Sequence, residues 1–273
     1  MTSPLSPANA TLLSCTFGTA YVVPFYLWSP AKTGDGRGRN HPGVIRSRLL
    51  SIALSSLVDC GIVYYIASRT LANRQDTLSE TLSLLGFQWP NNPRAFLLAP
   101  VIYGGSLLSS ALAGTLPHHE SFRSWLGLRN YLVAPITEEV VFRSCCLAVA
   151  SLAGQSFAYK VWVTPLYFGI AHLHHGWETY NQGGRSKSAL QKAVITTLVQ
   201  LTYTSLFGAF ASFLTVRTHS ILPALTSHIF CNLMGLPSIP FEHEVHPKYK
   251  YLLYAAHLAG IVGLGYLLYP WTQ

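Results

Sequence analysis

The sequence predicts an all-α fold, a polytopic membrane bundle of about eight transmembrane helices. Half of the 273 residues are hydrophobic and only 10% are charged, whereas soluble domains carry about 25% charged residues. Apolar segments of roughly 20 residues, the length needed to cross a bilayer, recur along the chain between polar or turn-forming segments. We therefore expect residues 1–273 to form a single multi-span membrane domain.

Eight segments have the length and apolar character of membrane spans. In chain order they are residues 9–29, 45–67, 94–115, 129–151, 157–175, 190–213, 218–236 and 250–270. The first has no basic segment before it, so we predict an uncleaved signal anchor. Residues 68–93 contain the amphipathic stretch LSETLSLLGF, which predicts a short helix at the membrane interface. Asp59 in the second span has no evident partner, and we assign it no role.

The net charge of +8 is spread over the loops, which contain no dense basic tract. This pattern indicates membrane topology and affinity for lipid headgroups, and it argues against nucleic-acid binding. Most Lys and Arg residues fall in loops on one side of the predicted spans. The positive-inside rule places that side in the cytosol and both termini on the other side. The five cysteines have neither zinc-finger nor disulfide spacing, so we expect free thiols.

Three charged residues lie inside the fourth span, in the stretch TEEVVFRS at residues 137–144. Glu139 and Arg143 are spaced i,i+4, so they meet on one helical face and can neutralise each other. Glu138 is rotated by about 100° from Glu139 and cannot share that partner equally well. We predict that Glu139 and Arg143 are supporting residues and that Glu138 has a chemical role. The alternative is one buried ion network that only holds helices together.

The fifth span contains the stretch YFGIAHLHH. Phe168 and His172 are spaced i,i+4, so the phenyl ring can pack beneath the imidazole and limit its rotamers. His174 and His175 follow at the end of the span, where we expect interfacial side chains. The deeper His172 is the candidate site residue, and a hydrogen-bonded core histidine is the alternative.

The seventh span contains LTSHIFCNLMG, in which His228 and Asn232 are again spaced i,i+4. An amide and an imidazole on one face can both donate hydrogen bonds to an oxyanion. The alternative is that both residues hydrogen-bond neighbouring membrane helices.

Glu138, His172, His228 and Asn232 together suggest hydrolysis by an activated water inside the membrane. Glu138 is the candidate general base, and His172 would position the water or share its proton. Two other chemistries use the same region. Zinc could be held by His172, His228 and Glu138, as in some catalytic sites, although the sequence has no His-Glu-x-x-His. Cys231 could be a nucleophile, although nothing in the sequence activates its thiol.

The three clusters also resemble a known family. The family pattern is Glu-Glu-x-x-x-Arg, then Phe-x-x-x-His, then His-x-x-x-Asn, each on its own membrane helix. This chain carries E138-E139-V-V-F-R143, F168-G-I-A-H172 and H228-I-F-C-N232 in that order. Over residues 120–240 it is similar to the CAAX prenyl endopeptidases of the Ras-converting type, a branch of the intramembrane glutamate proteases and bacteriocin-processing proteins.

The resemblance implies an enzyme of the endoplasmic reticulum membrane whose site is reached from the cytosol. Such enzymes remove the aaX tripeptide from CaaX proteins, such as Ras-type GTPases, after farnesylation or geranylgeranylation. It implies that Glu138 activates water, that His172 assists and that His228 with Asn232 binds the oxyanion. It also implies no metal and no cofactor.

A transporter that relays protons or ions through the same buried residues is the alternative function. The sequence does not support this alternative with the repeated hydrophobic segments or paired broken helices that many transporters show.

Overall fold

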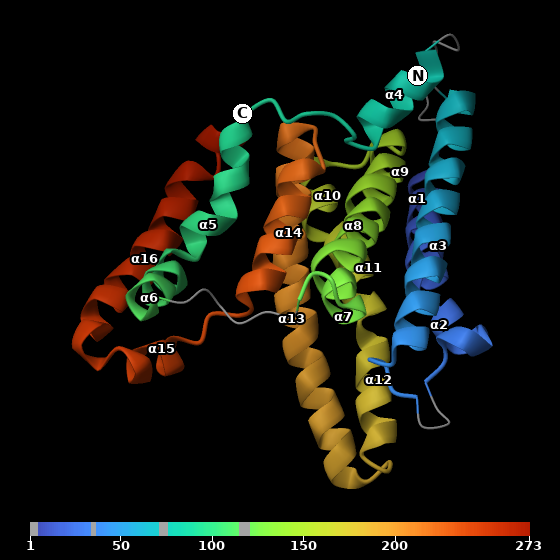
Figure 1. The fold of residues 1–273 in the computed structure, drawn as a ribbon. Helices are drawn as coiled ribbons and strands as arrows, with labels where there is room; N and C mark the ends of the chain where they lie inside the picture. The colour runs from blue at the N-terminus through green and yellow to red at the C-terminus, as the bar shows by residue number, and fades with distance from the viewer. Residues whose placement is uncertain (1–4, 34–36, 71–75, 115–120) are drawn as a thin grey trace.

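A computed structural model of the protein describes residues 5–33, 37–70, 76–114 and 121–273, which form an all-helical fold (Figure 1). Its α-helices are α1 (Pro7–Val22), α2 (Pro24–Leu27), α3 (Pro42–Thr70), α4 (Thr77–Leu84), α5 (Leu98–Ile102), α6 (Gly104–Ala113), α7 (Trp125–Leu128), α8 (Ala134–Glu139), α9 (Cys146–Leu152), α10 (Phe157–Trp162), α11 (Thr164–Ala171), α12 (Leu173–Gln182), α13 (Lys187–Thr218), α14 (Leu222–Met234), α15 (Ile239–Val245) and α16 (Lys250–Leu267). The predicted all-α class is confirmed. The amphipathic stretch near residue 80 is the short helix α4.

The chain is a polytopic membrane protein, but the predicted count of eight spans is not confirmed. Within the described ranges, three helical segments are long and apolar enough to cross a membrane: Pro7–Leu27, Pro42–Thr70 and Lys187–Thr218. A fourth span results if the pair Pro93–Ile102 and Gly104–Ala113, bent by 68°, crosses as one. These four correspond to the first, second, sixth and third predicted spans. The fourth and fifth predicted spans are divided among shorter helical segments, the seventh is the 13-residue α14, and the eighth is the 18-residue α16, which is not among the segments long and apolar enough to cross.

The helical run that carries the acidic pair is continuous but irregular. Between α7 and α9 it contains two π-helical segments, Arg129–Val133 and Val140–Cys145, on either side of α8. Pro135 has no N–H and its ring clashes with the carbonyl four residues earlier in a regular helix. Just before it, the N–H of Ala134 instead donates to the carbonyl of Arg129, five residues back. Such π-bulges occur frequently at functional sites, and here they flank Glu138 and Glu139.

The largest apolar core surrounds this helical run. Phe17 and Tyr21 of α1 and Ile45 and Ile52 of α3 are buried in one cluster with Phe142 of the run. Figure 1 shows α1 and α3 side by side along one flank of α8 and α9. This core therefore fixes the position of α8 relative to the first two spans.

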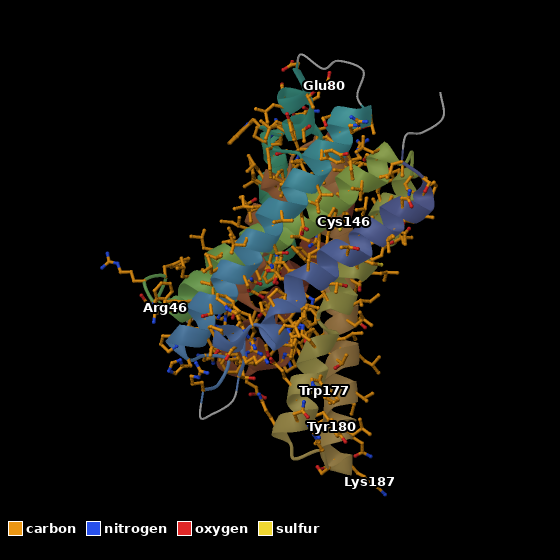
Figure 2. All side chains as sticks on the ribbon, turned by 90° about the vertical axis from the view of Figure 1, so that its right-hand side faces the viewer. Arg46, Glu80, Cys146, Trp177, Tyr180 and Lys187 are labelled. Atoms are coloured by element: carbon orange, nitrogen blue, oxygen red, sulfur yellow. The ribbon has the colours of Figure 1, made fainter. Side chains whose placement is uncertain are left out.

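Two peripheral units complete the fold. The hairpin of α12 and α13 extends beyond the rest of the bundle (Figure 1), and Figure 2 shows Trp177 and Tyr180 along it and Lys187 at its far end. On the other side of α14, α16 packs along α5 and α6. Glu242 of α15 joins this unit, because it accepts hydrogen bonds from Ser106 Oγ and His257 Nε2, both at 2.8 Å. α14 lies between this unit and the main bundle.

Candidate active site

The acidic pair sits on α8, where its two members have different surroundings. Glu139 is fully buried, and its Oε1 lies 3.2 Å from Nη1 of the buried Arg143. The Arg143 guanidinium stacks on the Phe168 ring at 4.3 Å. At Gly208 of α13 an added Cβ would lie 3.1 Å from Arg143 Nη2, so the absence of a side chain there leaves room for the guanidinium. The ion pair expected from the i,i+4 spacing is therefore present.

His228 of α14 connects the two glutamates. Its Nδ1 is 2.7 Å from Glu139 Oε1, and its Nε2 is 3.6 Å from Glu138 Oε2. The carboxylate Oε1 of Glu139 accepts, so Nδ1 carries the hydrogen and donates it. The sequence did not reveal this contact, because the two residues lie 89 positions apart. Glu139 is consequently more than the partner of Arg143, since it also fixes the orientation of the His228 ring.

His172 lies at the break between α11 and α12. Its Nδ1 donates to the Phe168 carbonyl at 2.8 Å, which leaves Nε2 with a lone pair in the neutral imidazole. The Phe168 ring contacts the imidazole edge-on, with 4.6 Å between the ring centroids. The packing predicted for this i,i+4 pair is present, and the backbone hydrogen bond adds a fixed tautomer to it.

Asn232 follows His228 by one turn of α14. Its Nδ2 donates to the Asn130 carbonyl at 2.8 Å, and the side chain is exposed. An amide nitrogen has two hydrogens, so one N–H remains beside the bond to Asn130. The contact links α14 to the π-helical segment Arg129–Val133.

These side chains share one cavity of about 630 Å³, within the 300–1,000 Å³ range typical of ligand sites. Its wall includes Glu138, His172, His228 and Asn232, which come from three separate parts of the chain. Apolar and aromatic side chains make up much of the remainder, among them Tyr21, Val22, Phe25, Leu49, Ile52, Tyr103, Phe142 and Phe207. The cavity wall thus combines polar side chains with apolar and aromatic ones.

The residues named for zinc and thiol chemistry, and Asp59, also have defined places in the structure. Among the described residues, no three His, Cys, Asp or Glu side chains form a group that could hold a metal ion. The proposed zinc set of Glu138, His172 and His228 is thus not assembled as a ligand cluster. Cys231 does line the cavity and is a free thiol. Asp59 is buried in α3 and is not part of the cavity wall.

A second polar cluster borders the cavity and was missed by sequence reasoning. Arg48 of α3 forms an ion pair with Glu178 of α12, with 3.3 Å between Nη2 and Oε1. His175 Nδ1 lies 3.7 Å from the other oxygen of Glu178. Arg48, His174 and His175 all belong to the cavity wall, so the expectation that the two histidines are merely interfacial is incomplete. No local spacing could indicate a pair separated by 130 positions.

Acid and imidazole groups that are held together beside a cavity, as Glu139, His228 and Glu138 are here, can act as general acids and bases in hydrolysis. A profile of the type II CAAX prenyl endopeptidase, Rce1-like family matches residues 120–234. CAAX prenyl protease 2 of Arabidopsis thaliana is 33% identical over 97% of this chain and 76% of the relative. CAAX prenyl protease 2 of Homo sapiens is 31% identical over 96% of this chain and 81% of the relative. The probable CAAX prenyl protease 2 of Schizosaccharomyces pombe is 31% identical over 84% of this chain and 81% of the relative. No solved structure matches the chain.

This chain therefore belongs to the Rce1-like family of type II CAAX prenyl endopeptidases and is a CAAX prenyl protease. The matched residues 120–234 include all of the side chains that carry the three motifs. Their catalytic roles remain predictions, which the geometry above makes specific.

Proposed function

We propose that this chain hydrolyses the peptide bond after the prenylated cysteine of CaaX proteins and releases the aaX tripeptide, with water as the nucleophile. The observation that carries the proposal is that Glu138, His172, His228 and Asn232 line one cavity. Membership of the family supports the substrate class, since relatives are CAAX prenyl proteases.

Glu138 is the best-placed general base. Unlike Glu139, it has no arginine partner among the described residues, and it faces the cavity. In the proposed step the water oxygen attacks the scissile carbonyl while Glu138 takes one water proton. His172 Nε2 accepts a hydrogen bond from the same water and orients it. Collapse of the tetrahedral intermediate breaks the C–N bond, and Glu138 returns the proton to the leaving amine.

His228 and Asn232 are proposed to stabilise the oxyanion. Because His228 Nδ1 donates to Glu139, an imidazolium is required for Nε2 to donate as well. The flanking carboxylates of Glu138 and Glu139 are positioned to compensate that positive charge. Asn232 would contribute the amide hydrogen that is not used by Asn130. Each preorganised donor of this kind is worth about 10²–10³ in turnover.

The apolar walls fit a lipid-modified substrate. A prenyl chain gains about 0.8 kcal/mol for each methylene group that it buries, and Val22, Phe25, Leu49 and Ile52 offer such a surface. The proposed substrates are farnesylated or geranylgeranylated proteins of the Ras GTPase type. The proposed location is the endoplasmic reticulum membrane, with the site reached from the cytosol.

A direct test uses the purified protein and a farnesylated CaaX peptide. The wild type should release the terminal tripeptide, and a chelator should not change the rate. Glu138→Gln and His172→Ala should lose at least 10²-fold in turnover, whereas Cys231→Ala should remain active. Full activity of Glu138→Gln would refute the assignment of the base. Inhibition by chelator or loss of activity in Cys231→Ala would favour zinc or thiol chemistry.

A further inference from the structure

Three arginines line the cavity that holds the candidate catalytic residues, and two of them form no ion pair with an acidic residue that the structure describes. Arg48 is neutralised by Glu178 at 3.3 Å and also donates to the Ala31 carbonyl at 3.0 Å. Arg39 and Arg129 belong to the same wall. Within the part of the chain that the structure describes, neither forms an ion pair with a carboxylate. Two positive charges thus face a cavity. Among the described residues of its wall, Glu138 is the one carboxylate.

Hydrogen bonds hold Arg129 in place. Its Nε donates to Asn130 Oδ1 at 2.9 Å, and its Nη1 donates to the Arg39 carbonyl at 3.2 Å and to Asn40 Oδ1 at 3.1 Å. These bonds fix both the guanidinium and the backbone of Arg39. None of these bonds uses Nη2, so within the described residues its two N–H groups can donate to a ligand. A carboxylate oxygen can accept from Nη2 without loss of the three bonds that hold the guanidinium.

Helix geometry sets the separation between Arg129 and the proposed base. The two residues are nine positions apart on one continuous helical run. At about 1.5 Å per residue the rise is roughly 13 Å, and slightly less because of the π-helical segment. An extended peptide advances about 3.3 Å per residue, so three residues beyond a scissile bond span roughly 10 Å. The tail of an aaX segment therefore reaches the region of Arg129 when its scissile carbonyl is near Glu138.

The cavity wall near Arg39 is also open to a polar environment. A neighbouring cavity of about 330 Å³ shares Arg39, His175 and Gln200 with the main one, and Glu178 and Thr196 are also in its wall. The wall at Arg39 thus adjoins polar space, and the same cavity also has apolar wall residues such as Leu49 and Ile52. The cavity therefore offers both charged and apolar surface to a substrate.

We propose that Arg129, together with Arg39, binds the C-terminal carboxylate of the substrate. Recognition of the C-terminal carboxylate would place the scissile bond, three residues upstream, at Glu138. Cleavage would therefore depend on the length of the segment after the cysteine. The inference rests on the proposed function, because it assigns a substrate group to the cavity in which hydrolysis is proposed. Hydrogen bonds from an arginine to a carboxylate are charge-assisted and are among the stronger hydrogen bonds in proteins.

The test compares three farnesylated peptides of equal sequence: one with a free C-terminal carboxylate, one with a C-terminal amide and one extended by a single alanine. We expect the wild type to cleave the free acid with a kcat/KM roughly 10- to 100-fold above that of the amide, the range for a hydrogen bond to a charged group. The extended peptide should be cleaved as poorly as the amide. In the Arg39→Gln/Arg129→Gln double variant the ratio of acid to amide should fall close to one.

Arg46→Gln is the matched control. Arg46 is exposed on α3, contacts Trp125 and does not line the cavity. It should keep the wild-type preference. If Arg129→Gln unfolds, the single Arg39→Gln variant can be used instead, because Arg39 is exposed and its replacement should not affect folding. This variant should still lower the ratio of kcat/KM for the acid to that for the amide, since Arg39 lines the cavity.

The outcomes separate the two proposals. A wild type that cleaves none of the peptides refutes the proposed function. A wild type that cleaves acid and amide equally, or a double variant that retains the preference, overturns the carboxylate site alone.

Discussion

His228 Nδ1 and Glu139 Oε1 lie 2.7 Å apart, and the same oxygen lies 3.2 Å from Arg143 Nη1. One buried carboxylate oxygen of Glu139 therefore forms an ion pair with Arg143 in the same helical run, and it also accepts a hydrogen bond that orients His228 of α14. The other ring nitrogen of His228 is turned to Glu138, with 3.6 Å between Nε2 and Oε2. Two adjacent glutamates thus bracket one imidazole, and among the described residues Glu139 alone of the two forms an ion pair with an arginine.

Replacement of Glu139 should affect both stability and activity. In Glu139→Gln the buried guanidinium of Arg143 loses its counter-charge, which typically costs about 3–5 kcal/mol, and the charged acceptor of His228 Nδ1 is replaced by a neutral amide. We expect an inactive protein with a clearly lower unfolding temperature. Glu138→Gln should be equally inactive but near wild type in stability, because Glu138 has no such partner. Thermal unfolding in detergent and peptide cleavage measure the two effects.

A double variant separates the two functions of Glu139. Glu139→Gln combined with Arg143→Met removes both charges, so at least half of the lost stability should return. Activity should not return, since the acceptor for His228 Nδ1 is still altered. Equal destabilisation by Glu138→Gln and Glu139→Gln would contradict the different surroundings described for the two residues.

Asn232 should matter for turnover more than for stability. Its side chain is exposed and makes one hydrogen bond to a backbone carbonyl, so Asn232→Ala should change the free energy of unfolding by about 1 kcal/mol or less. Loss of an oxyanion donor should lower kcat by about 10²–10³. Asn232→Asp should be at least as impaired, because it replaces the donor by a negative charge.

Asn92 provides a matched control for this prediction. Its Nδ2 also donates to a backbone carbonyl, that of Pro270, at 3.2 Å, and it does not line the cavity. Asn92→Ala should keep full activity. If Asn232→Ala keeps activity within about threefold of wild type, Asn232 serves only to hold α14 against Asn130.

Local sequence spacing predicted the parts of the site that one helix determines. The Glu139–Arg143 pair and the Phe168–His172 contact both follow from i,i+4 geometry. Contacts between distant segments could not be derived in this way. His228 with Glu139 and Arg48 with Glu178 depend on how helices pack, and a single sequence contains no periodicity that specifies such pairing.

The predicted count of eight spans is not confirmed for a related reason. Hydropathy identifies apolar length, but it does not show where a helix breaks. His172 terminates α11, and Pro135 is accompanied by a π-helical segment, so two predicted spans are irregular in the structure. The residues that interrupt these spans are in or next to the candidate site. Thus the sequence pattern was least accurate where the candidate chemistry lies.

The packing of α3 against the helical run that carries Glu138 and Glu139 can be tested with native cysteines. Cys60 Sγ and Cys145 Sγ lie 3.7 Å apart as free thiols, and a disulfide requires about 2.05 Å. A shift of under 2 Å would join them, so copper phenanthroline should oxidise this pair selectively. Mass spectrometry of peptides should detect the Cys60–Cys145 link in the wild type and not in Cys60→Ala. Preferential linkage of either thiol to Cys15 or Cys231 would contradict the packing.

The Arg48–Glu178 pair should make stability depend on pH at the base of the α12–α13 hairpin. Burial raises the pKa of Glu178, but the neighbouring His175 and the charge of Arg48 outweigh it and lower the pKa to about 2. A carboxyl whose folded pKa is below its unfolded value stabilises the fold fully above the unfolded value, about 4.3 for glutamate. That contribution is lost as the pH falls toward 2.

Glu178→Gln should therefore lower the unfolding temperature by several degrees between pH 5 and 7. The difference from wild type should shrink as the pH is lowered from about 4.3 toward 2, because the wild-type carboxyl is then protonated as well. Glu244→Gln is the control, since Glu244 is exposed and forms no ion pair among the described residues. A difference that stays constant over this pH range would show that Glu178 stabilises the hairpin by packing and not by its charge.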